Sequence, residues 1–163
     1  MEEAVFIAEA EGRIYVRAQG HVTAALCPEL KTRIFPRLEA EPGVEAVYFD
    51  LGPCEYMDST FLGLIVGINK RLKLAASRPV VLLHVNDTCL GLLKTIGVTK
   101  LVELSTEEVP FPHGLSRVGP GPRATAEFLL DAHEELSDLS EENKKRFSTL
   151  TDTLRSALGK GED

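Results

Sequence analysis

The sequence predicts a mixed α/β domain, an α+β mixed sheet of about four to five strands covered by helices, followed by a helical extension. Two strand patterns come first, and helix and strand patterns then alternate up to residue 104. A Pro- and Gly-rich stretch separates this part from two further helical patterns. We therefore divide the chain into a domain (1–105), a linker (106–123) and a C-terminal helical extension (124–163) that packs on the domain or on a partner.

The N-terminal residues predict a hairpin and then a helix. Val5 to Ala10 and Ile14 to Gln19 are strand patterns, and the turn Glu11-Gly12-Arg13 between them holds the glycine that tight hairpins need. Thr23 can cap the helix that follows, and Pro36 favours an early end or a kink in it. The apolar residues of this helix repeat at helical spacing: Leu26, Leu30, Ile34 and Leu38.

The middle of the chain alternates buried strands with helices. Val44 to Leu51 is rich in β-branched and aromatic residues, which favour a buried strand. The helix beginning near Asp58 ends at Ser77-Arg78-Pro79, and Val80 to Val85 is short and apolar enough for a buried parallel strand. The apolar residues of the helix recur on one face: Phe61, Leu64, Ile65, Ile68 and Leu72.

A short helix and a short strand complete the domain. Asp87 can cap the helix and Gly97 can end it, since glycine is the usual residue at that position. Leu101 to Leu104 has the pattern of a last strand. The predicted order is therefore β-β-α-β-α-β-α-β, which favours a mixed sheet.

The extension contains two apolar stripes, which predict two helices or one long kinked helix. Ser140, followed by Glu141 and Glu142, is typical of a new helix start. We expect the first helix to pack back on its own domain, because a mixed sheet needs cover. We leave open whether residues 141–158 pack on the chain itself, form a homodimer or bind a partner. The first stripe is Phe128, Leu129, Ala132, Leu136 and Leu139, and the second is Phe147, Leu150, Leu154 and Leu158.

Composition argues against several classes of function. The net charge of −7 disfavours a nucleic-acid surface, which would need clustered Lys and Arg. No apolar run approaches the roughly 18 residues of a membrane span, and the first twelve residues lack the basic flank and apolar core of a secretory signal. We therefore expect a cytoplasmic protein that does not insert into a membrane.

The residues that usually carry catalysis or bind metal show no such pattern. Cys27, Cys54 and Cys89 lack the spacing of a redox or zinc site, which indicates buried thiols in a reducing compartment. The four histidines have no metal spacing, and no Ser-His-Asp arrangement can be assembled from the sequence. We expect no metal, no cofactor and no enzyme activity.

The most informative segment runs from Tyr56 to Gly63, between a predicted strand and a predicted helix. Asp58 and Ser59 fall at the helix N-terminus, where unpaired N–H groups and the helix dipole favour negative charge. A hydroxyl group at this place can cap the helix or carry a phosphate, and the residues alone leave both uses open.

The element order and three short motifs resemble the STAS domain, which sulfate transporters share with bacterial anti-sigma-factor antagonists. The core motif is Asp58-Ser59-Thr60-Phe61-Leu62-Gly63, and the other two are Gly20-His21-Val22-Thr23 and Leu92-Leu93-Lys94-Thr95-Ile96-Gly97. The resemblance covers roughly residues 4 to 105, and Ala124 to Asp138 would supply the final helix of the family.

The resemblance implies a regulatory module that switches partners. In the sigma-factor regulators of the family, a serine-kinase anti-sigma factor phosphorylates the serine after the aspartate, and a metal-dependent serine phosphatase removes the phosphate. Carried over by position, Ser59 is the phosphate acceptor, with Thr60 as the alternative. The implied partner-binding residues are Asp58, Ser59, Thr60, Phe61 and Leu62.

Phe61 departs from the family pattern, which often has a glycine at this position. A phenylalanine can fill the core or alter the docking surface, and the outcome bears on whether a kinase reaches Ser59. Two other functions compatible with the resemblance are a non-phosphorylated subunit of a membrane transport complex and a domain that senses an anion or a nucleotide at the helix N-terminus.

Overall fold

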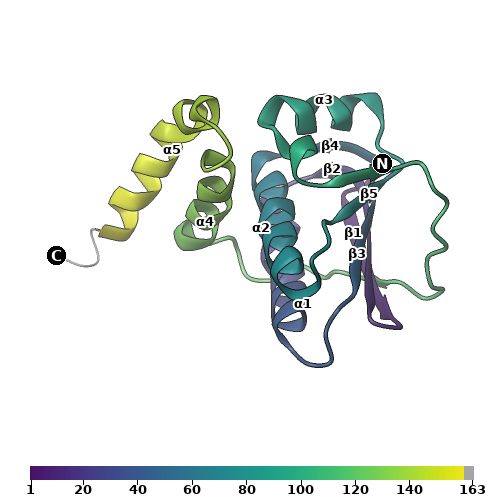
Figure 1. Ribbon diagram of the computed structural model, residues 1–163. Coiled ribbons are helices and arrows are strands. Elements are labelled where there is room, and N and C mark those ends of the chain that lie inside the picture. The colour runs from purple at the N-terminus through teal and green to yellow at the C-terminus, as the bar shows by residue number, and fades with distance from the viewer. Residues whose placement is uncertain (160–163) are drawn as a thin grey trace.

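A computed structural model describes residues 1–159 and confirms the mixed α/β fold with helices against the sheet (Figure 1). The sheet has seven strands in this part of the chain, rather than four to five. The strands are β1 (Ala4–Ala10), β2 (Arg13–Val22), β3 (Ala46–Asp50), β4 (Cys54–Met57), β5 (Val81–Leu83), β6 (Glu103–Ser105) and β7 (Ser116–Arg117). The helices are η1 (Ala24–Leu26), α1 (Cys27–Glu39), α2 (Ser59–Ala76), α3 (Asp87–Ile96), η2 (Val98–Lys100), α4 (Ala126–Ser137) and α5 (Glu141–Gly159).

The sheet is mixed because a hairpin precedes the crossover units. Its order is β6-β5-β3-β2-β1-β7, with β4 pairing β2 beside this path. β1 is antiparallel to both β2 and β7, whereas the pairs β2–β3, β3–β5 and β5–β6 are parallel. Parallel neighbours need crossover connections, and α1, α2 and α3 lie in these connections.

Three local expectations differ from the structure. The expected strand 44–51 corresponds to the shorter β3, and a second strand, β4, follows it after a turn. β4 pairs with β2, whose register shifts between Gly20 and His21. Pro36 lies inside α1, which continues to Glu39 rather than ending early; Pro36 is exposed, as is Thr32, whose carbonyl group it leaves unpaired. The cap of α3 is Asn86 rather than Asp87, since the Asn86 side chain accepts a hydrogen bond from the Cys89 amide.

The main core lies between the sheet and α1 and α2. On β2, Ile14 and Val16 are buried in this core, whereas Tyr15 and Arg17 point to the opposite face because side chains alternate along a strand. The core extends to Phe61 at the start of α2, whose fully buried ring lies 6.1 Å from that of Phe49 on β3. The start of α2 is therefore fixed to the sheet by a large apolar side chain.

The linker crosses the face of the sheet that α1 and α2 leave free. The Phe111 ring packs 5.0 Å from the Tyr15 ring, and the Arg17 guanidinium lies 5.1 Å from the Phe111 centroid. β7 then pairs with β1 at the far edge of the sheet. Figure 1 shows the linker leaving the β6 side and reaching α4 on the other side of α2.

The extension forms two helices, which lie beside the domain (Figure 1). α4 packs against α2, and α5 packs against α4. On α5, Phe147 and Leu154 are buried, whereas Leu150 and Leu158 are more than a third exposed. A homodimer through residues 141–158 stays a prediction. In residues 1–159, no helix combines the length and apolar character that crossing a membrane requires.

Candidate functional site

Asp58 organises the start of α2. It is the N-cap, with extended backbone, and its Oδ1 accepts a hydrogen bond from the Phe61 amide at 2.9 Å. Its Oδ2 accepts a second hydrogen bond from the Ala24 amide at 2.9 Å, which ties the helix start to the segment after β2. Burial raises the pKa of Asp58 above its ordinary value, although the backbone N–H groups of Phe61, Ala24 and Thr60 oppose this rise.

Ser59 is the first residue of α2, and its hydroxyl group meets a histidine from the extension. The Ser59 Oγ lies 2.7 Å from Nε2 of His133, which is 74 positions away in the sequence. The Nδ1 of His133 lies 2.7 Å from the carbonyl oxygen of Leu129. Since that carbonyl can only accept, Nδ1 carries a proton, and in the neutral ring Nε2 accepts the hydrogen bond from Ser59.

His133 is the site residue that the sequence did not reveal. Only 2% of its surface is exposed, and its ring packs edge-on against Phe147 of α5 at 5.5 Å. The one available indication was its helical spacing from Leu129 and Leu136, which places it on the apolar stripe. Its Nδ1 binds a backbone carbonyl rather than a carboxylate, so the pair lacks the third member of a hydrolase triad.

The five predicted partner-binding residues divide into two groups. Asp58 and Ser59 are partly exposed. Thr60, Phe61 and Leu62 are 4%, 0% and 2% exposed. Phe61 therefore points into the core and does not stand over the hydroxyl group of Ser59.

Gly63 allows α4 to approach α2 at the same place. A Cβ atom at this position would lie 2.2 Å from the carbonyl oxygen of Ala132, far inside any tolerated contact. Ala132 directly precedes His133, so the two contacts act on one turn of α4. The glycine of the Asp-Ser-x-x-Leu-Gly motif is therefore a packing residue in this chain.

A second polar cluster lies on the opposite face of the sheet. Burial favours the neutral form of Asp50, but hydrogen bonds from Gly52 N–H, His84 and Arg17 outweigh it and hold the pKa of Asp50 below its ordinary value. The hydrogen bond to Asp50 raises the pKa of His84, which also lies 3.6 Å from Glu108 of the linker. This cluster helps to hold the linker against the sheet.

The three cysteines are buried and are not arranged with other side chains to hold a metal ion in the described residues. Cys27, Cys54 and Cys89 are buried free thiols, and burial raises the pKa of Cys27. Among residues 1–159, no group of three or more His, Cys, Asp or Glu side chains is arranged to hold a metal ion.

Comparisons with solved structures give the same fold. The unphosphorylated form of the anti-sigma factor antagonist SpoIIAA matches with a TM-score of 0.55 at 19% identity, covering 63% of this chain and 89% of that chain. The phosphorylated form of Bacillus SpoIIAA matches with a TM-score of 0.52 at 17% identity, covering 63% and 92%. A putative anti-sigma factor antagonist from Thermotoga maritima matches with a TM-score of 0.52 at 18% identity, covering 60% and 82%.

Sequence comparisons give the family. A search among curated proteins finds no match. The family model described as STAS domain matches residues 6–109, close to the expected 4–105. This chain therefore belongs to the STAS domain family.

Proposed function

We propose that this chain is a regulatory protein-binding module, an anti-sigma-factor antagonist in a cytoplasmic partner-switching pathway. A serine-kinase anti-sigma factor phosphorylates Ser59, and a serine phosphatase resets the switch. The observation that carries the proposal is the position of Ser59, the first residue of α2 next to its cap Asp58, in a fold similar to that of SpoIIAA. SpoIIAA itself has been solved in phosphorylated and unphosphorylated forms.

The chemistry of the helix start supports this role. A phosphate adds about −1.5 to −2 charges, and the unpaired N–H groups at a helix N-terminus tolerate it. Beside Asp58 the same charge would repel an acidic or closely fitted partner surface. Modification of Ser59 would therefore turn partner binding off without unfolding the domain.

Burial favours Ser59 over Thr60 as the acceptor. Ser59 is partly exposed, whereas Thr60 is 4% exposed and faces the interior. We propose that Asp58 and Ser59 contact the partner directly. Thr60, Phe61 and Leu62 then contribute by holding the helix start in place.

Phosphorylation can be measured directly. The full chain is incubated with a serine-kinase anti-sigma factor and ATP, and the intact mass is recorded for wild type, Ser59→Ala and Thr60→Val. We expect one phosphate on wild type and Thr60→Val, and none on Ser59→Ala. Phosphate on Ser59→Ala, or its absence from wild type with an active kinase, would contradict the proposal.

Partner binding gives a second measurement. Unphosphorylated wild type should bind the kinase, and Ser59→Asp should bind it much more weakly. Stable co-purification with a transporter subunit that Ser59→Asp leaves unchanged would instead indicate a transport role. Saturable nucleotide binding lost in Ser59→Ala would indicate an anion sensor.

A further inference from the structure

We infer that α4 and α5 form an intramolecular cover over the start of α2, which moves away before a partner reaches Ser59. We call these two helices the C-terminal cover. The inference rests on the proposed function, because it concerns the regulation of the same serine. Three sets of contacts carry it.

The first contact is the hydrogen bond that engages the switch hydroxyl group. Ser59 Oγ donates to His133 Nε2 at 2.7 Å, and His133 is almost fully buried. A kinase active site must surround the acceptor hydroxyl group, because the phosphoryl donor approaches that oxygen in line. The His133 ring occupies part of that space, so a kinase cannot surround the partly exposed hydroxyl group of Ser59 while the cover is closed.

The second contact is the backbone approach between α2 and α4. Gly63 lies one helical turn after Ser59, and its missing side chain leaves room for the carbonyl group of Ala132. Any larger residue at position 63 would push this turn of α4, and His133 with it, away from α2. The closed position therefore depends on one glycine.

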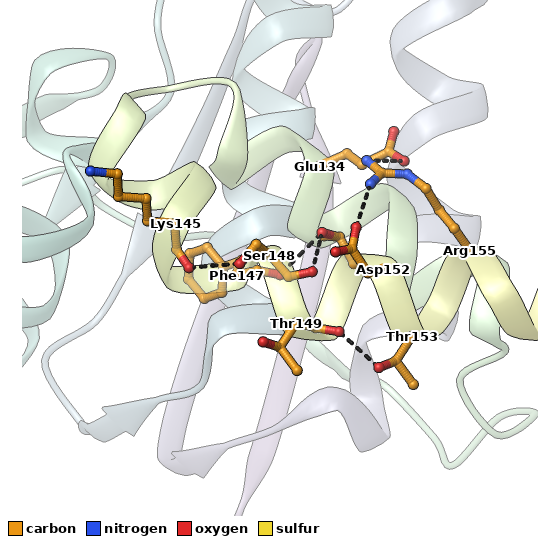
Figure 2. A network of polar contacts seen from close by, with 9 residues as sticks. Glu134, Lys145, Phe147, Ser148, Thr149, Asp152, Thr153 and Arg155 are labelled. Atoms are coloured by element: carbon orange, nitrogen blue, oxygen red, sulfur yellow. Dashed lines mark hydrogen bonds and ion pairs between the residues drawn. The ribbon is translucent and has the colours of Figure 1, made fainter.

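The third set of contacts joins α5 to α4 and the domain. The Asn143 side chain donates to the carbonyl oxygens of Leu136 at 2.8 Å and Ile96 at 2.7 Å, and thus connects α4, α5 and the end of α3. Figure 2 shows Arg155 of α5 paired with Glu134 of α4, at 3.3 Å. The two helices consequently behave as one unit that closes over Ser59.

The rim of the cover is suited to release. Lys70 pairs with Glu135 at 3.5 Å and Lys31 with Asp131 at 3.9 Å; Lys70 and Asp131 are exposed, whereas Lys31 and Glu135 are partly buried. Exposed ion pairs contribute little to stability. Water can therefore replace these contacts when α4 leaves α2.

The state of Ser59 is linked to the position of the cover. With a neutral His133 ring, the closed hydrogen bond uses the hydroxyl proton of Ser59, because Nε2 is then the acceptor. A phosphate replaces that proton with acceptor oxygens and adds bulk where the buried ring lies. Phosphorylated Ser59 therefore favours the open form, and unmodified Ser59 favours the closed form.

Thiol labelling tests the cover without any partner. In the full chain, Ser59→Cys is treated with a bulky maleimide and the labelling rate is followed by intact mass. The buried Cys27, Cys54 and Cys89 serve as internal references for a folded domain. We expect slow labelling of Ser59→Cys, since His133 and α4 shield position 59.

Gly63→Ala opens the cover in the same background. We expect labelling of Ser59→Cys/Gly63→Ala to be at least about tenfold faster, because the open fraction rises. The matched control is Ser59→Cys/Gly91→Ala: Gly91 lies in α3, and a Cβ atom there meets nothing within 4 Å. The control should label at the rate of Ser59→Cys, and equal rates for all three proteins would overturn the inference.

Two further measurements distinguish a failure of the cover from a failure of the proposed kinase switch. Ser59→Cys/His133→Ala should also label faster, so the test does not depend on the folding of Gly63→Ala; an unchanged rate in both variants would overturn the cover. Kinase phosphorylation of the Ser59 protein should be faster with Gly63→Ala than with Gly91→Ala. If thiol labelling responds as expected but no variant accepts phosphate, the cover exists and the proposed kinase switch is wrong.

Discussion

The STAS domain and the C-terminal cover share one apolar core, but the cover depends on polar contacts as well. The domain surrounds a continuous apolar core, to which Phe49, Phe61 and Ile65 contribute fully buried side chains. At the contact of α4 with α2, a hydrogen bond and a close backbone approach are added to the apolar packing of Leu136, and charged side chains lie at the edge. Glu135 Oε2 is buried there without a hydrogen-bond partner in residues 1–159, at a cost of about 1–3 kcal/mol. Because these polar contacts and the unpaired Glu135 oxygen belong to the interface of the cover, we propose that the cover opens at a lower free energy than the domain unfolds.

The largest effect is expected in the domain. Phe61→Ala removes a fully buried ring that contacts Phe49, and should lower the free energy of unfolding by about 3–5 kcal/mol. Denaturant unfolding of the full chain measures this change. The control Leu74→Ala, at a position 83% exposed, should stay within about 0.5 kcal/mol of wild type. A loss below about 1 kcal/mol for Phe61→Ala would mean that Phe61 does not anchor α2.

The next effect should stay inside the cover. Leu136 of α4 is fully buried, so Leu136→Ala should destabilise its surroundings by about 2–4 kcal/mol. Hydrogen exchange should show lost protection in α4 and α5, because a detached 12-residue helix is marginal in water. Protection in β3 and α2 should be unchanged. Equal losses throughout would show that the two regions unfold together.

A smaller effect is expected where the two regions join. Asn143→Ala leaves the carbonyl oxygens of Leu136 and Ile96 without their shared donor, and should cost about 1–3 kcal/mol in the protection of α5. The control Ser148→Ala removes only a hydrogen bond to the Lys145 carbonyl within α5 (Figure 2). If hydrogen exchange in α5 is the same in the two variants, Asn143 does not connect the cover to the domain.

The smallest effect concerns pH and the linker. The pKa of His84 is raised in the folded state. Its contribution to the free energy of unfolding is therefore fully present below about pH 6.5 and is lost as pH rises through the folded pKa. The lowered pKa of Asp50 gives a contribution that is present above about pH 3.9 and is lost as pH falls through the folded pKa. Because the His84 side chain is 42% exposed, its contribution to the free energy of unfolding should not exceed about 1 kcal/mol.

Replacing His84 isolates its contribution to the pH dependence of stability. His84→Gln should remove the loss of stability above neutral pH and leave the loss in acid, as measured by denaturant unfolding across pH 4 to 9. His113→Gln, at an exposed linker position, is the matched control and should keep the wild-type profile. A wild-type profile for His84→Gln would mean that its pairing with Asp50 does not stabilise the fold.

The sequence predicted those features that have a local pattern. The apolar periodicity located the longer helices, and the Asp-Ser pair after a strand placed Ser59 at the start of α2. β7 is only two residues long, too short for any periodicity. Asn86 rather than Asp87 caps α3, because the two neighbours are both good caps. His133 could not be paired with Ser59, since only the route of the linker brings these distant residues together.

The route of the linker also bears on the proposed opening of the cover. The linker is fixed to the sheet as far as Val118, which is buried and whose amide donates to the Val5 carbonyl at 2.7 Å. Only residues 119–125 then separate this anchor from α4. Over so short a tether, the released helices keep an effective concentration of about millimolar near α2. In the proposed switch, recapture of the helices is therefore fast, and a partner must compete with them for the start of α2.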